Sequence, residues 1–452
     1  MPTVPFDSTI YRGLFHDPDI ARLLSDSAEV RAMLLVEGAL AKVQGELGLI
    51  PETSATFIHR AAMEVQIDPA ALTAETATNA VPVPALVRAF RHALDAPEHA
   101  AWVHYGATSQ DIMDTALALR LRQVLTLLEG RARRLLGSLA VLARAHAHLP
   151  MAARTWGQNA TVTTFGAVVA EWGRPVLRLL EDLEKAREHA LQVSLSGAAG
   201  TLSAMGDAGP EVRRRLAASL GLRDPGASWH NDRLPIAGVA TWASGIAGAA
   251  GKMGEDLLLL THSGIEEVSA GSGGASSTMP QKSNPVGPSV LVALARHAAL
   301  LSGATTMARL HREQRDGAAW MTEWLSLPQI LMASGQAVRL AADIAAVLEP
   351  NARAMRCGLD PDGLGLVHAE RIAFALAERM PRPEAQAAVK SLAAEARTRH
   401  VPLPELLTLR FPELDIQTLT DPMSGTGQAP ADALAFAAAA EKAATTADEP
   451  PA

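Results

Sequence analysis

The chain contains a single cysteine, Cys357, among its 452 residues. One thiol can form neither an intramolecular disulfide nor a cage of thiolate metal ligands, so disulfide scaffolds and zinc ribbons are excluded. This composition agrees with a reducing compartment, and we expect a cytoplasmic protein.

Runs of basic residues are also missing. The 40 Lys and Arg residues are outnumbered by 48 Asp and Glu, which gives a formal net charge of −8. Because nucleic-acid-binding surfaces concentrate positive charge, nucleic acid is not an expected partner. The first residues, MPTVPFDSTIYRG, lack the basic and then apolar order of a secretory signal, so we expect no signal peptide.

The sequence has little that resembles a membrane span. The nearest stretch is 236–253, IAGVATWASGIAGAAGKM, which is dominated by Ala and Gly and is soon followed by Glu255 and Asp256. Small residues at this density are typical of a tightly packed helix, so we interpret the stretch as buried in the protein and expect no membrane partner.

Alternation with a period of two, the pattern of a half-buried strand, is not sustained anywhere in the chain. Apolar residues instead recur every three or four positions over 28–49, and again over 114–149 for about ten helical turns. A second long helical pattern is expected over 168–193. We therefore predict an all-α fold with a long central helix bundle. The domains that we predict are an N-terminal helical domain over 1–112, the bundle over 113–355, and a C-terminal helical domain over 356–452 that ends in a disordered tail, TTADEPPA.

Motifs for metals and nucleotides are absent or incomplete. The 14 His residues are scattered, and no HExxH or close Cys/His cluster occurs. GSGGAS at 271–276 supplies only part of GxGxxG and follows a helical pattern, while Gln281 stands where a Walker loop has glycine before its lysine. We expect neither a metal nor a cofactor.

The stretch 271–289, GSGGASSTMPQKSNPVGPS, differs sharply from its helical flanks. Gly, Ser and Pro occupy almost every second position, which is typical either of an inert flexible linker or of a mobile catalytic loop. Met279, Lys282 and Asn284 among the small residues favour the second interpretation. We call this stretch the catalytic loop.

Polar residues also gather where other helical patterns break, in HYGATSQDIMDT, RTWGQNA and WHNDR. A further polar and aromatic cluster, EQRDGAAWMTEW at 313–324, is expected within a later helix. Thr108 and Asp111 have the spacing of a capping box, and helix capping alone is one reading of them. The other reading is chemical. Removing or adding a proton beside a carboxylate creates a dianion, which Lys282, Asn284 and backbone N–H groups could stabilise while Ser276 or Ser277 serves as the base.

The pattern SSTMPxKxNP in the catalytic loop resembles the signature of the fumarase/aspartase superfamily, with Ser276, Lys282 and Asn284 in place. HYGATSQDIMDT resembles the first signature of that superfamily, and RTWGQNA resembles its second. The resemblance implies a homotetramer with a twenty-helix core, in which each active site collects residues from three subunits.

The same resemblance implies roles for single residues. Ser276 would be the base, Lys282 and Asn284 would bind the carboxylate beside the carbon that exchanges a proton, and His104 would either assist proton transfer or only pack. The remaining candidates for substrate binding are Thr108, Ser109, Thr155, Trp156, Gln158, Arg233, Ser277, Thr278, Met279 and Arg315.

Within the superfamily, ATSQDIMDTAL, WHNDR and GAAWMTEW resemble the carboxymuconate cycloisomerases of bacteria, as does Trp156 where fumarases carry histidine. The implied activity is lactonisation of a small polycarboxylate in aromatic degradation. Asn159, Gln281 and Ser283 depart from the usual His, His and Arg, which leaves the substrate open. A lyase that releases fumarate from a succinyl adduct and a catalytically silent structural relative remain as alternatives.

Overall fold

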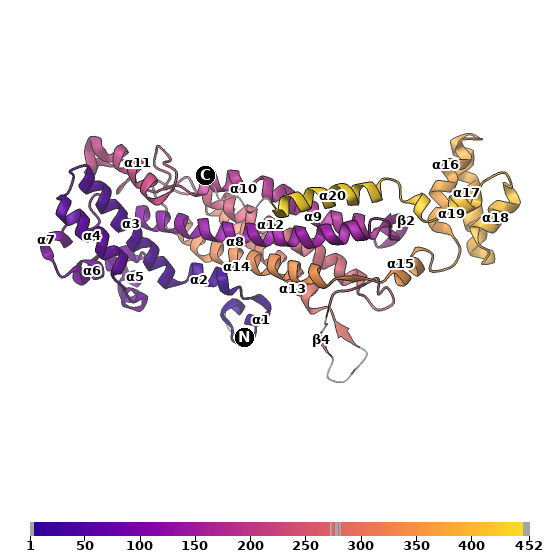
Figure 1. The fold of residues 1–452 in the computed structure, drawn as a ribbon, viewed down its shortest axis with the longest axis horizontal. Helices are drawn as coiled ribbons and strands as arrows, with labels where there is room; N and C mark the ends of the chain where they lie inside the picture. The colour runs from indigo at the N-terminus through magenta and orange to yellow at the C-terminus, as the bar shows by residue number, and fades with distance from the viewer. Residues whose placement is uncertain (1–3, 272–273, 276–278, 280–281, 446–452) are drawn as a thin grey trace. The chain divides into compact units, whose positions relative to one another are not determined.

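The structure is a computed structural model that describes residues 4–271, 274–275, 279 and 282–445 (Figure 1). Helices account for most of these residues, and the strands are short. The prediction of an all-α fold class is therefore confirmed. The tail TTADEPPA lies outside the described residues except for Thr445, the last residue of a helix.

The chain forms two compact units, each built from three segments. Unit 1 comprises residues 1–129, 179–248 and 294–336, and unit 2 comprises 130–178, 249–293 and 337–452. The boundaries of these units differ from those of the three predicted domains, which stay a prediction. The helices that contribute residues to both units are α8 (Ser109–Ala145), α9 (Phe165–Glu181), α12 (Leu234–Leu260), α13 (Val286–Met307) and α14 (Gly317–Val347).

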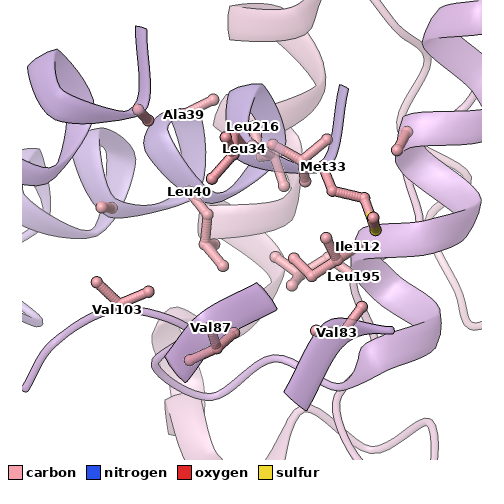
Figure 2. Packing of buried hydrophobic residues seen from close by; sticks show 14 of the residues in the cluster. Met33, Leu34, Ala39, Leu40, Val83, Val87, Val103, Ile112, Leu195 and Leu216 are labelled. Carbon is pink, nitrogen blue, oxygen red and sulfur yellow. The ribbon is translucent and has the colours of Figure 1, made fainter. Parts of the chain in front are cut away.

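Unit 1 is built on the packing of α3 (Asp26–Glu46) against α4 (Glu52–Glu64). Ser25 caps α3, since its hydroxyl accepts a hydrogen bond from the Ala28 N–H at 3.3 Å. Figure 2 shows Met33, Leu34 and Leu40 of this helix within the unit's buried hydrophobic cluster. The other elements confined to unit 1 are η1 (Pro5–Asp7), α1 (Arg12–Phe15), α2 (Pro18–Leu24), η2 (Pro69–Leu72), α5 (Thr73–Asn79), α6 (Val83–Leu94), α7 (Pro97–Ala100), α10 (Leu183–Ala190), η3 (Ser203–Ala208) and α11 (Gly209–Leu220).

Unit 2 contains a smaller cluster of buried apolar side chains, contributed by α16 (Ala369–Ala377), α17 (Arg382–Arg399) and α18 (Leu403–Arg410). It also contains all the named strands of the described residues, paired as β1 with β2, β3 with β6, and β4 with β5, each pair antiparallel. Its other elements are β1 (Pro150–Thr155), β2 (Gln158–Thr164), β3 (Val268–Ser269), β4 (Gly274–Ala275), β5 (Ser283–Asn284), β6 (Glu349–Pro350), α15 (Ala352–Leu359), η4 (Leu366–His368), α19 (Ile416–Thr420), η5 (Met423–Gly425) and α20 (Ala429–Thr445).

Four local expectations need correction. RTWGQNA is not a plain break between helices, because it forms the turn of the β1–β2 hairpin. The helical run expected over 168–193 is divided at Asp182 into α9 and α10. The polar residues 313–316 precede α14 and do not lie within a helix. The catalytic loop is shorter than predicted, since α13 already begins at Val286.

Three helices are long and apolar enough to cross a membrane by length and composition alone. They are α12, which includes the stretch 236–253, and also α13 and α14. In the most apolar windows of α12 and α14, 61% and 72% of the residues are buried within the protein, which agrees with the reading of stretch 236–253 as a packed helix. The corresponding share in α13 is only 33%.

Candidate active site

The loop before α8 carries His104 and is held by side chains of two other helices. Arg91 of α6 donates a hydrogen bond to the Val103 carbonyl at 2.8 Å, and Gln44 of α3 donates to the Tyr105 carbonyl at 2.8 Å. His104 itself has a φ of 65°, in the left-handed region that costs energy for a residue with a Cβ. The two hydrogen bonds, one on each side of His104, therefore hold its backbone in a conformation that an unrestrained loop would not keep.

The His104 ring is paired with a buried carboxylate. Its Nδ1 lies 2.7 Å from Oε1 of Glu37, whose side chain is 1% exposed. Burial by itself lowers the pKa of His104, but the Glu37 carboxylate outweighs burial, and Asp111 adds to its effect while Arg91 opposes it. The net result is a pKa above the usual value for histidine, so the ring carries more positive charge near neutral pH than a free histidine.

Asp111 connects the first motif to two other parts of unit 1. Its Oδ2 accepts from the backbone N–H of Thr108 at 3.0 Å and of Gly197 at 2.9 Å. Its Oδ1 accepts from the N–H of Ser196 at 2.8 Å and lies 2.8 Å from His230 Nε2. This fully buried carboxylate thus fixes the start of α8 against residues 196–197 and against His230 of the WHNDR segment. The bond to Thr108 is one half of the predicted capping box.

Thr108 and Ser109 lie half-buried at the N-terminus of α8, a helix of 37 residues. Backbone N–H groups of the first turn have no partner within the helix, and the helix dipole places partial positive charge there. The two hydroxyls and this turn therefore form a region suited to an anion.

Arg315 belongs to the same region through Gln110, the second residue of α8. Its Nε donates to Gln110 Oε1 at 2.7 Å, and the arginine is only partly buried. The Gln110 amide nitrogen donates to the His230 carbonyl at 2.9 Å. Gln110 therefore orients Arg315, which keeps accessible N–H groups that could bind a carboxylate.

Arg233 has a different environment from the one that a substrate-binding residue needs. Its side chain is 0% exposed and forms paired hydrogen bonds of 2.7–3.0 Å to Asp114 and 2.7–2.8 Å to Glu323. The guanidinium also lies over the Trp229 ring, 4.9 Å from its centroid. This geometry favours a structural role, because the donors of Arg233 are already used within the protein.

Thr155, Trp156 and Gln158 lie at the tip of the β1–β2 hairpin in unit 2. Thr155 pairs with Gln158, and Trp156 and Gly157 between them have φ angles of 54° and 73°. Two successive positive φ angles are the geometry of a type I′ turn. The Trp156 side chain is fully exposed, so the hairpin presents an indole together with a hydroxyl and an amide.

Two contacts hold this hairpin within unit 2. Arg154 forms a bidentate ion pair with the buried Glu267, with both N–O distances 2.7 Å. Asn159 donates from its amide nitrogen to the Gly358 carbonyl at 2.7 Å. Asn159 thus makes a hydrogen bond that secures the hairpin to α15.

The described part of the catalytic loop is a second small hairpin, made by β4 and β5. Met279 and Lys282 are exposed, and the Lys282 N–H donates to the Met279 carbonyl at 3.0 Å. Asn284 lies in β5 and is partly exposed. The predicted residues Ser276, Ser277 and Thr278 lie outside the described residues.

The structure thus places His104, Thr108, Ser109 and Arg315 around one end of α8 in unit 1, where Arg233 is also found but is enclosed. The other described candidates lie on two hairpins of unit 2. The sequence reasoning missed Glu37, Gln110 and His230. Glu37 breaks an apolar helical pattern, and such a charge on a buried face was the available signal for it. Nothing in the sequence alone pairs it with His104.

Comparison with known proteins identifies relatives over nearly the whole chain. A family model described as Lyase matches residues 17–299. The 3-carboxy-cis,cis-muconate cycloisomerase of Bradyrhizobium diazoefficiens is 36% identical over 90% of this chain and 93% of its own length. The nitrosuccinate lyase of Streptomyces davaonensis is 34% identical, with 90% of each chain covered.

Solved structures give the same result. The crystal structure of 3-carboxy-cis,cis-muconate lactonizing enzyme from Pseudomonas putida superposes with a TM-score of 0.89 at 32% sequence identity. The superposition covers 96% of this chain and 100% of that one.

Proposed function

The chain belongs to the lyase family of the fumarase/aspartase superfamily, and within it we propose a cofactor-independent cycloisomerase that converts 3-carboxy-cis,cis-muconate to 4-carboxymuconolactone. The observation that carries this proposal is the likeness to enzymes named for that substrate, which extends over 90% or more of the chain in sequence and in fold. The setting that it implies is the breakdown of aromatic acids in the cytoplasm.

The reaction is an intramolecular addition. One carboxylate oxygen of the substrate forms a C–O bond to a carbon of the double bond, and the adjacent carbon gains one proton. No group leaves, so product and substrate are isomers apart from the proton taken up from the enzyme or solvent. The charge to be stabilised lies on the carboxylate next to the carbon that gains the proton.

We assign the proton transfer to Ser276 of the catalytic loop and the carboxylate binding to Lys282 and Asn284. The exposed ammonium of Lys282 and the accessible amide of Asn284 support this assignment, because a dianionic carboxylate needs donors that are not already paired. Positive charge near Ser276 would lower the pKa of its hydroxyl and make it a usable acid and base.

His104 and the start of α8 are assigned to substrate carboxylates. With Nδ1 directed to Glu37, the ring can use Nε2 toward a ligand, and its raised pKa favours the form in which Nε2 donates. Thr108, Ser109 and Arg315 supply further donors in unit 1. Thr155, Trp156 and Gln158, with Ser277, Thr278 and Met279, complete the proposed binding set. The proposed binding set does not include Arg233, because its pairing with Asp114 and Glu323 favours a structural role.

We propose the homotetramer of the resemblance as the active form. The support within this chain is α13, whose apolar side chains Leu300 and Met307 are 75% and 65% exposed. An apolar helix that exposes most of its surface is costly in water unless another subunit covers it. Size-exclusion chromatography with light scattering measures the mass directly, and a monomer would contradict this proposal.

A second candidate function is a lyase that releases fumarate from a succinyl derivative. It is favoured by the nitrosuccinate lyase, which covers as much of the chain as the cycloisomerases do. The departures at Asn159, Gln281 and Ser283 are compatible with either substrate. The same residues would act, with the proton removed at one carbon while a bond to the neighbouring carbon breaks.

Parallel assays decide between these functions. Purified protein is incubated with 3-carboxy-cis,cis-muconate and, separately, with nitrosuccinate, adenylosuccinate and argininosuccinate, and products are identified by NMR. We expect lactone from the first substrate and no fumarate from the others. Fumarate without lactone would replace the first proposal by the second, and no product from any substrate would favour a catalytically silent relative.

A further inference from the structure

Unit 1 contains a cavity of about 660 Å³ that none of the proposed catalytic or substrate-binding residues lines. It is bordered by the start of α3, the η2–α5 segment, the second and third turns of α8, and α14. Its volume lies within the range of about 300–1,000 Å³ that is usual for small-molecule sites.

Most of the cavity wall is apolar. Met33, Leu72, Met113 and Leu331 contribute buried aliphatic side chains, and Trp320 contributes an aromatic one. Trp324 packs edge-on against Trp320, with ring centroids 4.8 Å apart, and also borders the cavity. A wall of this composition suits an aromatic or branched hydrocarbon body.

Five charged residues border the cavity, and two of them are already neutralised. Asp114 and Glu323 both bind Arg233 through paired hydrogen bonds of 2.7–3.0 Å. These two carboxylates are therefore already paired with Arg233, which does not line the cavity. The groups that remain are Asp26, Glu29 and Arg120.

Arg120 is the unusual member of this set. The residue is 8% exposed, and its buried Nε has no hydrogen-bond partner among the described residues. Its one described ion pair joins Nη1 to Glu29 Oε2 at 3.5 Å, which is too long for a good hydrogen bond. Burial lowers the pKa of Arg120, against the opposing effects of Glu29 and Asp26. A buried guanidinium in this state is costly unless an acceptor reaches it.

Glu29 shows that a carboxylate can reach Arg120 from the cavity side, yet it is free to leave. It lies in the first turn of α3, and 30% of its side chain is exposed. Glu29 can become hydrated when a ligand carboxylate takes its place, because the buried Arg120 then keeps an acceptor throughout the exchange. A ligand carboxylate could take its place and form the bidentate pair that Glu29 does not form.

We propose that this cavity binds a small monocarboxylic acid with an aromatic or branched apolar body, separately from the active site. The hydrocarbon body packs against Trp320, Trp324 and Leu331, and the carboxylate accepts hydrogen bonds from Arg120 after Glu29 turns to solvent. The proposal does not depend on which reaction the enzyme catalyses.

Isothermal titration of the purified full-length protein with 4-isopropylbenzoate tests the proposal, with 4-isopropylbenzyl alcohol and 4-isopropylbenzylamine as neutral and cationic probes of the same shape. We expect the acid to bind at least tenfold more tightly than either of the others. Equal or tighter binding of the amine, or no binding of the acid, would overturn the proposal.

Variants locate the binding. Arg120→Met should weaken binding of 4-isopropylbenzoate at least tenfold, and Glu29→Gln should strengthen it severalfold by removing a competitor. Arg122→Met is the matched control, because Arg122 is exposed on the same helix, borders no part of the cavity and donates to the Leu220 and Gly221 carbonyls. If Arg120→Met does not fold, Arg120→Lys replaces it, with a smaller loss expected. Unchanged binding in a folded Arg120 variant and in Glu29→Gln would refute the site.

Discussion

His104 and Trp156 occupy similar backbone positions in two different loops. Each is a residue with a Cβ in the left-handed region, with φ angles of 65° and 54°. His104 is held there by side chains of α3 and α6 and turns its ring onto Glu37, whereas Trp156 is held by a strand ladder and exposes its whole indole. The same local strain is thus stabilised by tertiary contacts in one loop and by local pairing in the other.

This difference predicts different responses to mutation. A side chain that is oriented by a buried partner should lose its function when the partner changes. A side chain on a self-sufficient turn can be replaced with little change in stability, so its loss reports on substrate contact alone.

Substitution of the proposed base, Ser276, should give the largest loss of activity. Ser276→Ala should lower kcat on 3-carboxy-cis,cis-muconate by about 10³–10⁴-fold, because no other group would carry the proton, with a stability change within about 0.5 kcal/mol. Ser283→Ala in β5 is the control and should keep most of the activity. Unchanged turnover in Ser276→Ala would remove the serine from the mechanism.

The buried network behind the His104 loop should give the largest effect on stability. Arg233→Met leaves Asp114 and Glu323 as uncompensated buried carboxylates, which should lower the free energy of unfolding by about 3–5 kcal/mol. Urea denaturation followed by circular dichroism measures this. The triple variant in which Asp114→Asn and Glu323→Gln accompany Arg233→Met should recover part of the loss, and no recovery would argue against charge burial as the cause.

Glu37→Gln tests the buried partner of His104. The substitution removes the charge that raises the pKa of the ring, so kcat/KM should fall about 10–100-fold and the alkaline limb of its pH profile should move to lower pH. A ¹⁵N NMR titration of His104 reports the pKa without reference to activity. The control is Gln44→Leu, which lies on α3 like Glu37. It removes the hydrogen bond to the Tyr105 carbonyl but no contact of the imidazole. A similar NMR shift in that control would mean that the loop, and not Glu37, sets the pKa.

The same pair predicts a pH dependence of stability. Because the pKa of His104 is raised in the folded state, its contribution is fully present below the unfolded pKa of about 6.5 and is lost as the pH rises through the folded value. The difference in Tm between the native protein and Glu37→Gln should therefore be larger at pH 6 than at pH 9. A constant difference across this range would show that the pair contributes through packing only.

Trp156→Asn should have the smallest effect on stability. Asn-Gly is the preferred pair for a type I′ turn, so the hairpin should be unchanged or slightly more stable. If the exposed indole contacts the substrate, KM should rise about tenfold while Tm stays constant. An unchanged KM would exclude Trp156 from substrate binding and leave its exposure unexplained by this function.

The sequence predicted the long helix α8 well, since it follows directly from an apolar stripe over 114–149, whereas the run expected over 168–193 is two helices. It missed the β1–β2 hairpin, although ATVTT is rich in β-branched residues and Trp156-Gly157 forms its turn. A period-two pattern gives little evidence for a strand over only six or seven residues, and the sequence contains no other strand pattern nearby that would suggest a partner. The catalytic loop motif was recognisable because its residues are consecutive.

By itself, the sequence determined the helical class, the family signatures and the identity of the residues that could handle a carboxylate. Those properties are local, because periodicity and consecutive motifs need no knowledge of distant contacts. Only the tertiary structure separated Arg315, which keeps accessible donors, from Arg233, which is fully enclosed by Asp114 and Glu323. It alone paired His104 with Glu37 across 67 positions, because burial and charge pairing depend on which segments the fold brings together.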